Sequence, residues 1–234
     1  MCLVSQSLRF TLCRCAASVT AVVAPAARDR SDARDRLLVA AERLIAERGM
    51  DAPLRDVAVE AGQRNNSAVH YYFGSRDGLI QAVIDRRQAP LEARRLELLA
   101  EHEAAGAGDD VRSLVRILVE PMFHVPYEDG ASHYARFLEQ VRTLLTEQQL
   151  DFSQWPTSKM ITARIQRMLA GLPADVRRLR LSSMATVMFA LMADAERRAD
   201  ATGERLSLDS PGRTEIITML VGLLTAETPS PTKE

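Results

Sequence analysis

A stretch of sixteen residues without a carboxylate, residues 61–76, carries most of the side chains in this 234-residue sequence whose types and spacing suit a binding chemistry. Guanidinium, amide and hydroxyl groups donate hydrogen bonds to phosphate oxygens, and an asparagine amide can also pair with the edge of adenine. The stretch is therefore predicted to contact nucleic acid. The candidate residues are Arg64, Asn65, Asn66, Ser67, His70, Tyr71, Tyr72, Ser75 and Arg76.

Patterns of catalysis and metal binding do not occur elsewhere in the sequence. The remaining histidines, His102, His124 and His133, lack metal-ligand spacing, and no glycine-rich phosphate loop or nucleophile elbow is found. The three cysteines all lie within residues 2–15, which gives neither a disulfide framework nor a zinc site. We therefore expect no enzyme activity, no metal and no cofactor.

A helix must precede the acid-free stretch. Apolar residues recur every three or four positions from Ser31 to Arg48, which predicts an amphipathic helix. Ser31 or Asp32 is expected to cap its start, and Gly49 to end it. The charged side chains of this helix, Glu42 among them, are expected on the surface.

Two very short helices then surround a glycine turn. The first covers residues 54–61 and stops at Gly62, the second covers 67–73, and a longer helix opens at Ser75. This order is typical of a helix-turn-helix motif, whose second helix enters the major groove. Apolar side chains of the second helix are expected to pack against the first helix of the chain: Ala68, Val69 and Phe73.

Some candidates have two interpretations. Tyr71 and Tyr72 either contact DNA or lie half-buried with the hydroxyl in water. Arg55, at the start of the first short helix, either contacts DNA or is a solvated surface charge.

The rest of the chain also has helical periodicity, with no alternating strand pattern. Beyond Pro90, glycine and proline residues separate the predicted helices. Asp109 and Asp110 are expected at a helix N-terminus. The predicted helices cover residues 91–104, 109–124, 131–148, 157–170, 174–201 and 211–226.

The last predicted helix is apolar around most of its circumference, so it must be covered on more than one side. The second cover is either a partner subunit or the core of the same chain. In the first case, the last two helices form a dimer interface. Its candidate residues are Met184, Val187, Met188, Leu191, Ile216, Met219, Leu220 and Leu223.

Three segments, residues 54–58, 61–62 and 68–79, agree in order and spacing with a known pattern, and the region 31–87 resembles the N-terminal domain of the TetR family of transcriptional regulators. The resemblance implies an all-α protein in which a three-helix DNA-binding domain precedes an all-helical ligand-binding and dimerisation domain. It also implies a homodimer that binds a palindromic operator, represses transcription, and releases DNA when a small molecule binds. The DNA-contacting positions that it implies are Arg55, Ser67, His70, Tyr71, Tyr72 and Arg76.

The domains predicted on this basis are residues 31–87 for DNA binding and 88–226 for regulation and dimerisation. Residues 1–30 are expected to form a disordered extension and 227–234 a disordered tail. Methionine and aromatic residues of the central helices would suit an apolar effector, although most residues of this kind are core residues. The candidate ligand-binding residues are Met122, Phe123, Tyr134, Phe137, Leu138, Trp155, Met160 and Met188.

The charge of the whole chain is −1, which at first argues against DNA binding, because sequence-independent affinity comes from cationic side chains. The acid-free stretch removes this objection locally, and it also argues against the alternative function of a helical small-molecule or interaction module that does not bind DNA. Lys159 and Lys233 are the only lysines, so phosphate contacts must come mainly from arginine. No run of apolar residues is long enough to span a membrane, and we expect a cytoplasmic protein.

Overall fold

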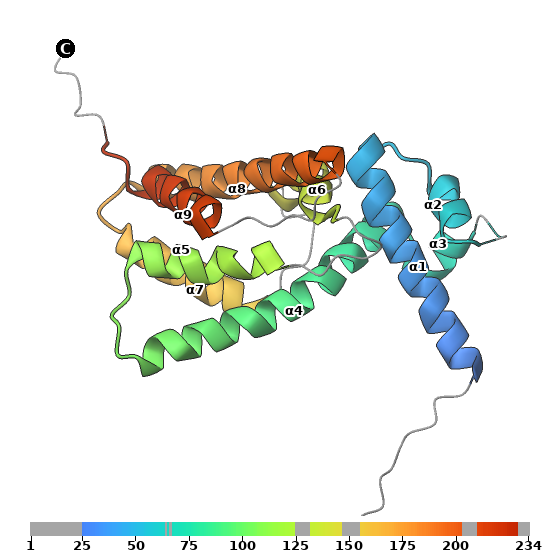
Figure 1. Ribbon diagram of the computed structural model, residues 1–234, viewed down its shortest axis with the longest axis horizontal. Helices are drawn as coiled ribbons and strands as arrows, with labels where there is room; N and C mark the ends of the chain where they lie inside the picture. The colour runs from blue at the N-terminus through green and yellow to red at the C-terminus, as the bar shows by residue number, and fades with distance from the viewer. Residues whose placement is uncertain are drawn as a thin grey trace, which may run out of the picture.

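The structure is a computed structural model that describes residues 25–63, 65, 67–124, 132–146, 155–202 and 210–228 (Figure 1). Every regular element in these residues is a helix, which confirms the all-α prediction. The predicted extension before residue 25 and most of the predicted tail lie outside the described residues. The helices are α1 (Pro25–Arg48), α2 (Leu54–Glu60), α3 (Ala68–Phe73), α4 (Arg76–Ala104), α5 (Val111–Val119), the 3-10 helix η1 (Glu120–His124), α6 (Tyr134–Thr146), α7 (Pro156–Met168), α8 (Ala174–Thr202) and α9 (Ser210–Thr225).

Helix α1 begins at Pro25, six residues before the predicted start, so the prediction of a cap at Ser31 or Asp32 is wrong. Proline suits the first turn of a helix because its φ is already helical and its missing N–H needs no partner there. The end of α1 is as predicted: the Gly49 amide donates to the Ile45 carbonyl at 2.9 Å, and the helix stops at Arg48.

The turns between the short helices depend on two glycines. Gly62 has a φ of +68°, a conformation that side chains disfavour, and it ends α2 as predicted. At Gly78 the constraint is contact, because a Cβ atom there would lie 2.1 Å from the Phe73 carbonyl oxygen. These two positions fix how α3 leaves α2 and how α4 leaves α3.

Prolines affect the longer helices differently. The predicted break near Pro90 is wrong, because the 29-residue helix α4 continues through this proline. The predicted domain boundary between residues 87 and 88 therefore falls inside α4. Buried side chains on both sides of the proline, such as Ile84 and Leu91, hold the helix against its neighbours. At Pro121, by contrast, α5 changes to the 3-10 helix η1, because proline cannot donate to the carbonyl four residues earlier.

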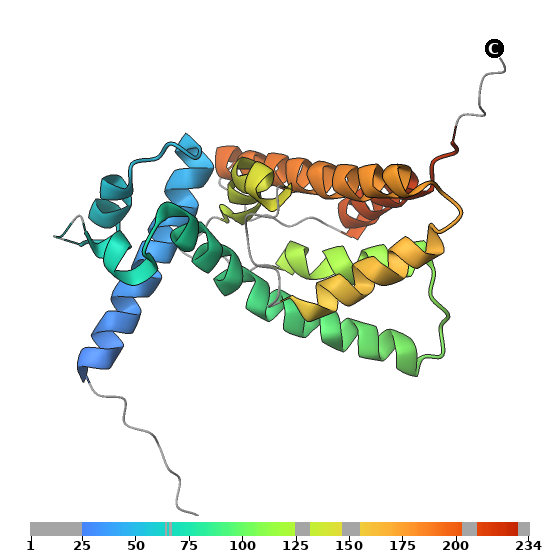
Figure 2. The same cartoon turned by 180° about the vertical axis from the view of Figure 1, so that it is seen from behind.

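The two ends of the molecule are built differently (Figure 1). Helices α1, α2 and α3 and the start of α4 form one end, and α5 to α9 form a bundle along the remainder of α4. Seen from behind, α6 lies in front of the part of α8 that is nearest to α1 (Figure 2), and it packs against both helices. One apolar core extends through both parts, from Leu37 in α1 to Leu224 in α9. Among the described helices, none combines the length and hydrophobicity needed to cross a bilayer.

Candidate nucleic-acid interface

Helices α2 and α3 have one buried side and one exposed side. Val57 and Ala58 of α2 and Ala68 and Val69 of α3 are buried, which confirms the expected core positions. Phe73 is partly buried against that core, with the Arg34 guanidinium 5.2 Å from its ring centre. The side of α3 that faces away from the core is left for contact with another molecule.

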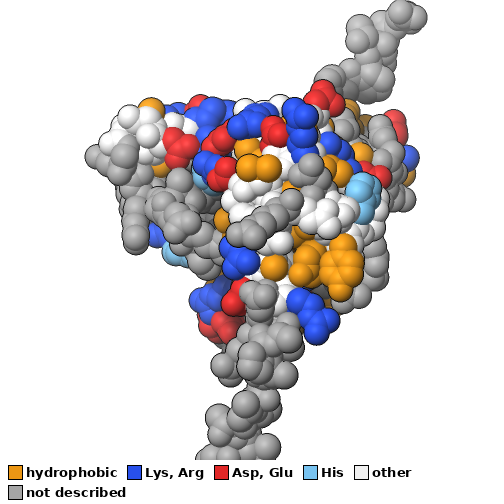
Figure 3. All heavy atoms as spheres, turned by 90° about the vertical axis from the view of Figure 1, so that its right-hand side faces the viewer, with side chains coloured by type: hydrophobic (Ala, Val, Ile, Leu, Met, Phe, Trp, Pro, Cys, Tyr) orange, Lys and Arg blue, Asp and Glu red, His pale blue; other side chains and the backbone are white. Residues whose placement is uncertain are grey.

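The two tyrosines of α3 have different surroundings. The side chain of Tyr71 is 72% exposed, whereas Tyr72 is half-buried and packs against the core. Their rings meet edge to face, with centres 4.9 Å apart. Tyr72 therefore supports the position of Tyr71, whose hydroxyl and ring edge are open to solvent. The end of the molecule that carries α2 and α3 shows a group of hydrophobic side chains next to basic ones (Figure 3).

His70 points outward from the same helix. Its Nδ1 lies 3.0 Å from the Gly74 carbonyl oxygen, and because a carbonyl only accepts, Nδ1 carries the proton. The opposite nitrogen, Nε2, can then accept a hydrogen bond from a donor on a base edge.

The start of α3 is organised by its own side chains. The Asn65 Oδ1 accepts from the Ser67 amide at 2.9 Å and from the Ser67 hydroxyl at 2.5 Å, which forms a turn before the helix. The Asn65 amide nitrogen remains exposed. Arg64 and Asn66, the other two candidates in this turn, lie outside the described residues.

The first turn of α4 is held by hydrogen bonds within the motif. The Ser75 hydroxyl caps the helix by accepting from the Gly78 amide at 3.0 Å. The Arg76 guanidinium donates to the carbonyls of Met50 at 2.7 Å and Ala52 at 2.9 Å. Both side chains therefore stabilise the motif itself, and their contact with phosphate stays a prediction.

Ion pairs that the sequence did not indicate hold α2 against α1. Arg43 pairs with Glu60, and Arg48 donates to the Asp56 carboxylate at 3.0 Å. Arg55, which is well exposed, lies 3.3 Å from the same carboxylate. Arg48 and Arg55 share the Asp56 carboxylate, and Arg55 contacts it only through Nε. The two terminal nitrogens of the Arg55 guanidinium can therefore donate to an outside partner.

Val59 was not among the predicted site residues, although it is the most exposed large apolar side chain of α2. It follows Arg55 by four positions, so the two share one side of the helix. This spacing was the signal that could have identified it. The exposed side chains of α2, of α3 and of the turn between them form what we call the outward face. Its residues are Arg55, Val59, Asn65, Ser67, His70 and Tyr71.

The predicted ligand-binding residues lie mostly in the core. Six of them are buried in the apolar cluster, Trp155 is half-buried, and Met160 is exposed. Burial of this kind matches the alternative interpretation, in which they are core residues. The six are Met122, Phe123, Tyr134, Phe137, Leu138 and Met188.

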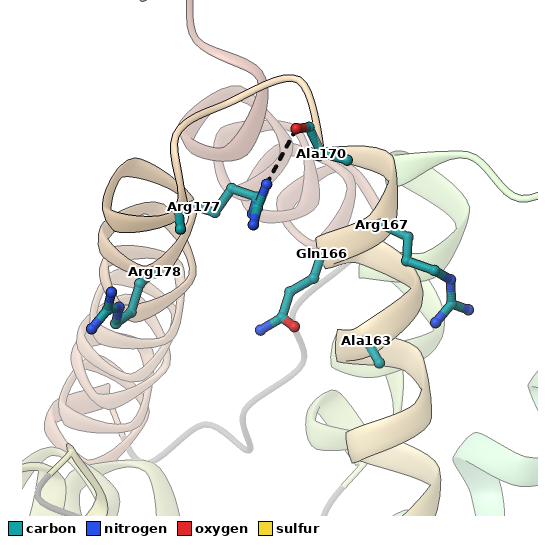
Figure 4. A pocket seen from close by; sticks show the side chains of 7 residues that line it. Ala163, Gln166, Arg167, Ala170, Arg177 and Arg178 are labelled. Atoms are coloured by element: carbon teal, nitrogen blue, oxygen red, sulfur yellow. Dashed lines mark hydrogen bonds between the residues drawn. The ribbon is translucent and has the colours of Figure 1, made fainter.

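An open pocket of about 570 Å³ lies elsewhere, between the end of α7 and the start of α8 (Figure 4). Arg177 donates to the carbonyls of Ala170 and Leu172, at 3.2 and 3.0 Å. In Figure 4, Gln166 points into the gap, whereas Arg167 and Arg178 point away from it on opposite sides. The lining therefore does not direct several cationic groups at one point. The lining residues are Ala163, Gln166, Arg167, Ala170, Ala174, Arg177 and Arg178.

The predicted dimer interface is only partly available to a partner. Met184, Met188, Ile216 and Leu220 are buried within the chain itself, which corrects their placement on the surface. The other four remain half-buried or exposed, with Met219 at 40% exposure, and the unpredicted Leu179 is 66% exposed. The apolar surface left on α8 and α9 consists of Leu179, Val187, Leu191, Met219 and Leu223.

The chain resembles known proteins most clearly at its N-terminal end. Residues 37–83 match the family described as "Bacterial regulatory proteins, tetR family". The HTH-type transcriptional regulator BetI of Stenotrophomonas maltophilia (strain R551-3) is 31% identical over 147 residues, which are 62% of this chain and 68% of that protein.

Two solved structures also align with most of the chain. A TetR-family transcriptional regulator from Rhodococcus sp. covers 83% of this chain and all of its own, with 20% identity and a TM-score of 0.40. The multidrug binding protein EbrR complexed with imidazole covers 86% of this chain and 98% of its own, with 18% identity and a TM-score of 0.35. Scores this low support no argument about the arrangement of this chain. The matched segment 37–83, in contrast, contains all of α2 and α3.

Proposed function

Because the chain belongs to the TetR family of bacterial transcriptional regulators, we propose that it is a ligand-responsive repressor that binds a palindromic operator as a homodimer in the cytoplasm. The observation that carries this proposal is the outward face. It places guanidinium, amide, hydroxyl and imidazole groups on the exposed side of a helix-turn-helix whose other side is core. These are the groups that read base edges and contact phosphates.

Within the outward face we assign different roles to different residues. His70 and Tyr71, on α3, are proposed to contact bases in the major groove. Arg55 on α2 and Ser67 at the start of α3 are proposed to contact phosphates, which fixes the register of the motif on the duplex. Val59 is proposed to make an apolar contact beside Arg55.

A single motif of this size reads few base pairs, so we propose that two copies act together. The two reading helices must then lie one turn of DNA apart, about 34 Å, or a multiple of it. The exposed apolar residues of α8 and α9, with Leu179 and Met219 the most exposed, are the proposed contact between the copies. The effector is proposed to act on the helical bundle and so change the distance between the reading helices.

Selection of duplexes from a random library by the purified protein tests the DNA-binding part. We expect an enriched sequence with two inverted half-sites, and a dimer in sedimentation. His70→Ala should lower affinity for that duplex about tenfold to a hundredfold, the usual cost of a lost base contact, and leave affinity for a scrambled duplex unchanged.

Arg94→Ala is the matched control, because Arg94 is an exposed arginine far along α4 whose partners are Glu97 and Glu101. It should leave both affinities unchanged. Enrichment of no sequence at all would contradict DNA reading and favour a helical binding module without DNA.

The effector is tested separately by thermal shift with a set of apolar small molecules. A compound that raises the melting temperature should also release the selected duplex. A compound set that stabilises the protein without releasing DNA would contradict ligand-responsive repression.

A further inference from the structure

Six polar side chains form a connected series through the interior, from α1 along α4 to α7. All six residues are less than one-tenth exposed, although five of them are charged or amide residues that usually lie in water. We call this series the buried polar chain. Its members, in order of contact, are Glu42, Arg87, Tyr134, Gln88, Arg95 and Glu92.

The first contact joins α1 to α4 and corrects the expectation that Glu42 lies on the surface. The Arg87 guanidinium donates to both carboxylate oxygens of Glu42, at 2.7 and 2.9 Å. The same guanidinium lies 6.0 Å from the ring centre of Tyr134 in α6. Three helices therefore meet at one ion pair, at the point where the helix-turn-helix end joins the bundle.

The next contacts continue into the bundle. Gln88 donates to the Tyr134 hydroxyl at 3.1 Å and accepts from Arg95 at 2.8 Å. Burial in this environment raises the pKa of Tyr134, so its hydroxyl stays protonated. Arg95 also donates to the Leu118 carbonyl at 2.9 Å, which attaches α5 to the same series.

The last contact reaches α7. Glu92 accepts from Arg95 at 3.1 Å, and its other oxygen accepts from the Thr157 amide at 2.8 Å. The Ser158 amide lies 3.3 Å from each oxygen of the same carboxylate. Glu92 thus caps the first turn of α7 from a different helix, where an anion is favoured.

Pro90 lies between the two halves of the series. It supplies no amide for the helix ladder, so α4 lacks the internal hydrogen bond from residue 90 to the Arg86 carbonyl. The direction of α4 at this position therefore depends more than usual on side-chain contacts to its neighbours. Apolar contacts permit sliding, whereas a two-bond guanidinium–carboxylate pair allows one geometry.

We propose that Glu42 and Arg87 are positioning residues for operator recognition. They lie away from the outward face and contact no DNA. They fix the angle at which the helix-turn-helix end leaves the bundle, and the rest of the buried polar chain extends that restraint to α5 and α7. This inference rests on the proposed function, in which two copies read half-sites at a fixed separation.

The test is the dependence of affinity on half-site spacing. Three duplexes carry the selected half-sites at their natural spacing, the same half-sites with two base pairs inserted, and one half-site alone. The double variant Glu42→Gln/Arg87→Met removes both charges of this ion pair, so neither partner is left as an unpaired buried charge. We expect it to bind the single half-site as the unaltered protein does, while its preference for the natural spacing falls by about tenfold, a typical coupling between sites.

Two further variants separate positioning from loss of stability. Leu114→Ala removes a fully buried side chain from α5, outside the series, and should keep the spacing preference in spite of lower stability. Arg87→Lys retains the charge but not the paired donors, and should give an intermediate preference even if the double variant does not fold.

The possible failures are distinguishable. If the folded double variant or Arg87→Lys keeps the full spacing preference, or if the double variant loses the single half-site equally, the inference is overturned. If the unaltered protein shows no preference for paired half-sites, the proposed function fails instead.

Discussion

Arg76 connects two parts of the helix-turn-helix end, since its guanidinium donates to carbonyls in the loop between α1 and α2. Arg76→Ala leaves both carbonyls without this donor, so we expect a loss of about 1–3 kcal/mol in the free energy of unfolding. The salt dependence of DNA binding should change little, because donors of Arg76 are occupied within the motif. Urea denaturation and a salt titration measure the two effects.

Arg55→Ala serves as the comparison, because Arg55 is an exposed arginine on the outward face. We expect its stability to change by less than about 0.5 kcal/mol and its salt slope to fall by about one. The opposite result, a lower salt slope of DNA affinity for Arg76→Ala with unchanged stability, would instead support the predicted phosphate contact of Arg76.

The two tyrosines of α3 provide a second comparison at the scale of single residues. Tyr71→Ala removes an exposed side chain, so stability should be unchanged while affinity for the selected duplex falls. Tyr72→Ala removes half-buried packing and should cost about 1–3 kcal/mol of stability. Thermal unfolding and duplex binding of both variants check this. Equal destabilisation by the two would contradict the assigned surroundings.

For single residues, the sequence predicts whether a side chain is buried better than it predicts the hydrogen-bond or ion-pair partner of that side chain. Ala68 and Val69 were identified as core because helical spacing shows which side of a short helix is apolar. The partners of Arg76 lie 24 and 26 residues earlier in the chain, and the Glu42–Arg87 pair spans 45 residues. Local periodicity contains no information about such distant contacts.

Helix α5 depends on its cap. The Asp110 carboxylate accepts from the Ser113 amide at 2.9 Å, as expected for a helix N-terminus. Hydrogen bonds from the Ser113 hydroxyl, and then from its amide, lower the pKa of Asp110. A lowered pKa means that the ionised cap stabilises the fold above about pH 4 and that this contribution disappears as the pH falls through the folded-state pKa. Asp110→Ala should therefore cost about 1 kcal/mol at pH 7 and progressively less at lower pH.

Denaturation of the unaltered protein and of Asp110→Ala at several pH values from 7 to 3 measures this difference in the free energy of unfolding. A destabilisation by Asp110→Ala that stays constant over the whole range would show that the carboxylate charge does not contribute.

Pro90 weakens α4 locally, since proline in the interior of a helix is less favourable than alanine. Pro90→Ala should raise the free energy of unfolding by about 1–3 kcal/mol, because it restores one hydrogen bond of the helix. Pro156→Ala is the control: Pro156 is at the first position of α7, where proline costs little, so no gain is expected. Loss of stability in Pro90→Ala would indicate that the neighbours of α4 require a bend at this position.

The ends of helices were predictable where local chemistry determines them. Gly49, Gly62 and Asp110 signalled their helix ends correctly. Pro90 was misread as a break because the packing on either side of it, which is not visible locally, keeps α4 helical. The start of α1 was missed for a similar reason: Ser31 is a good cap, but a proline six residues earlier is an equally good beginning.

His133 lies where α6 approaches α1 and α8. Burial, and then the neighbouring Arg136 guanidinium, lower the pKa of His133 below its usual 6.5. Because the folded state disfavours its protonation, the stability that it provides is present above about pH 6.5 and is lost as the pH falls through the lowered pKa. Burial raises the pKa of Glu196, so protonation of this carboxyl as the pH falls adds stability, in the opposite direction to His133.

His133→Gln should therefore reduce the loss of stability between pH 7.5 and pH 5.5 relative to the unaltered protein. His124→Gln provides the control, since His124 is largely exposed. Denaturant midpoints at the two pH values measure the change. A pH dependence altered equally by the two variants would contradict a role for burial at His133.

Helix α4 belongs to both ends of the molecule, and this limits how the protein can be divided. A fragment cut at residue 87 would end in the middle of a helix, with Arg87 at a fraying terminus. Recombination that joins a new sensing module to this DNA reader can cut instead after Ala104, in the segment before α5, and so keep α4 whole. The shortest unit that keeps α4 whole is therefore residues 25–104, and a regulator built by such an exchange would inherit all of α4 together with the helix-turn-helix.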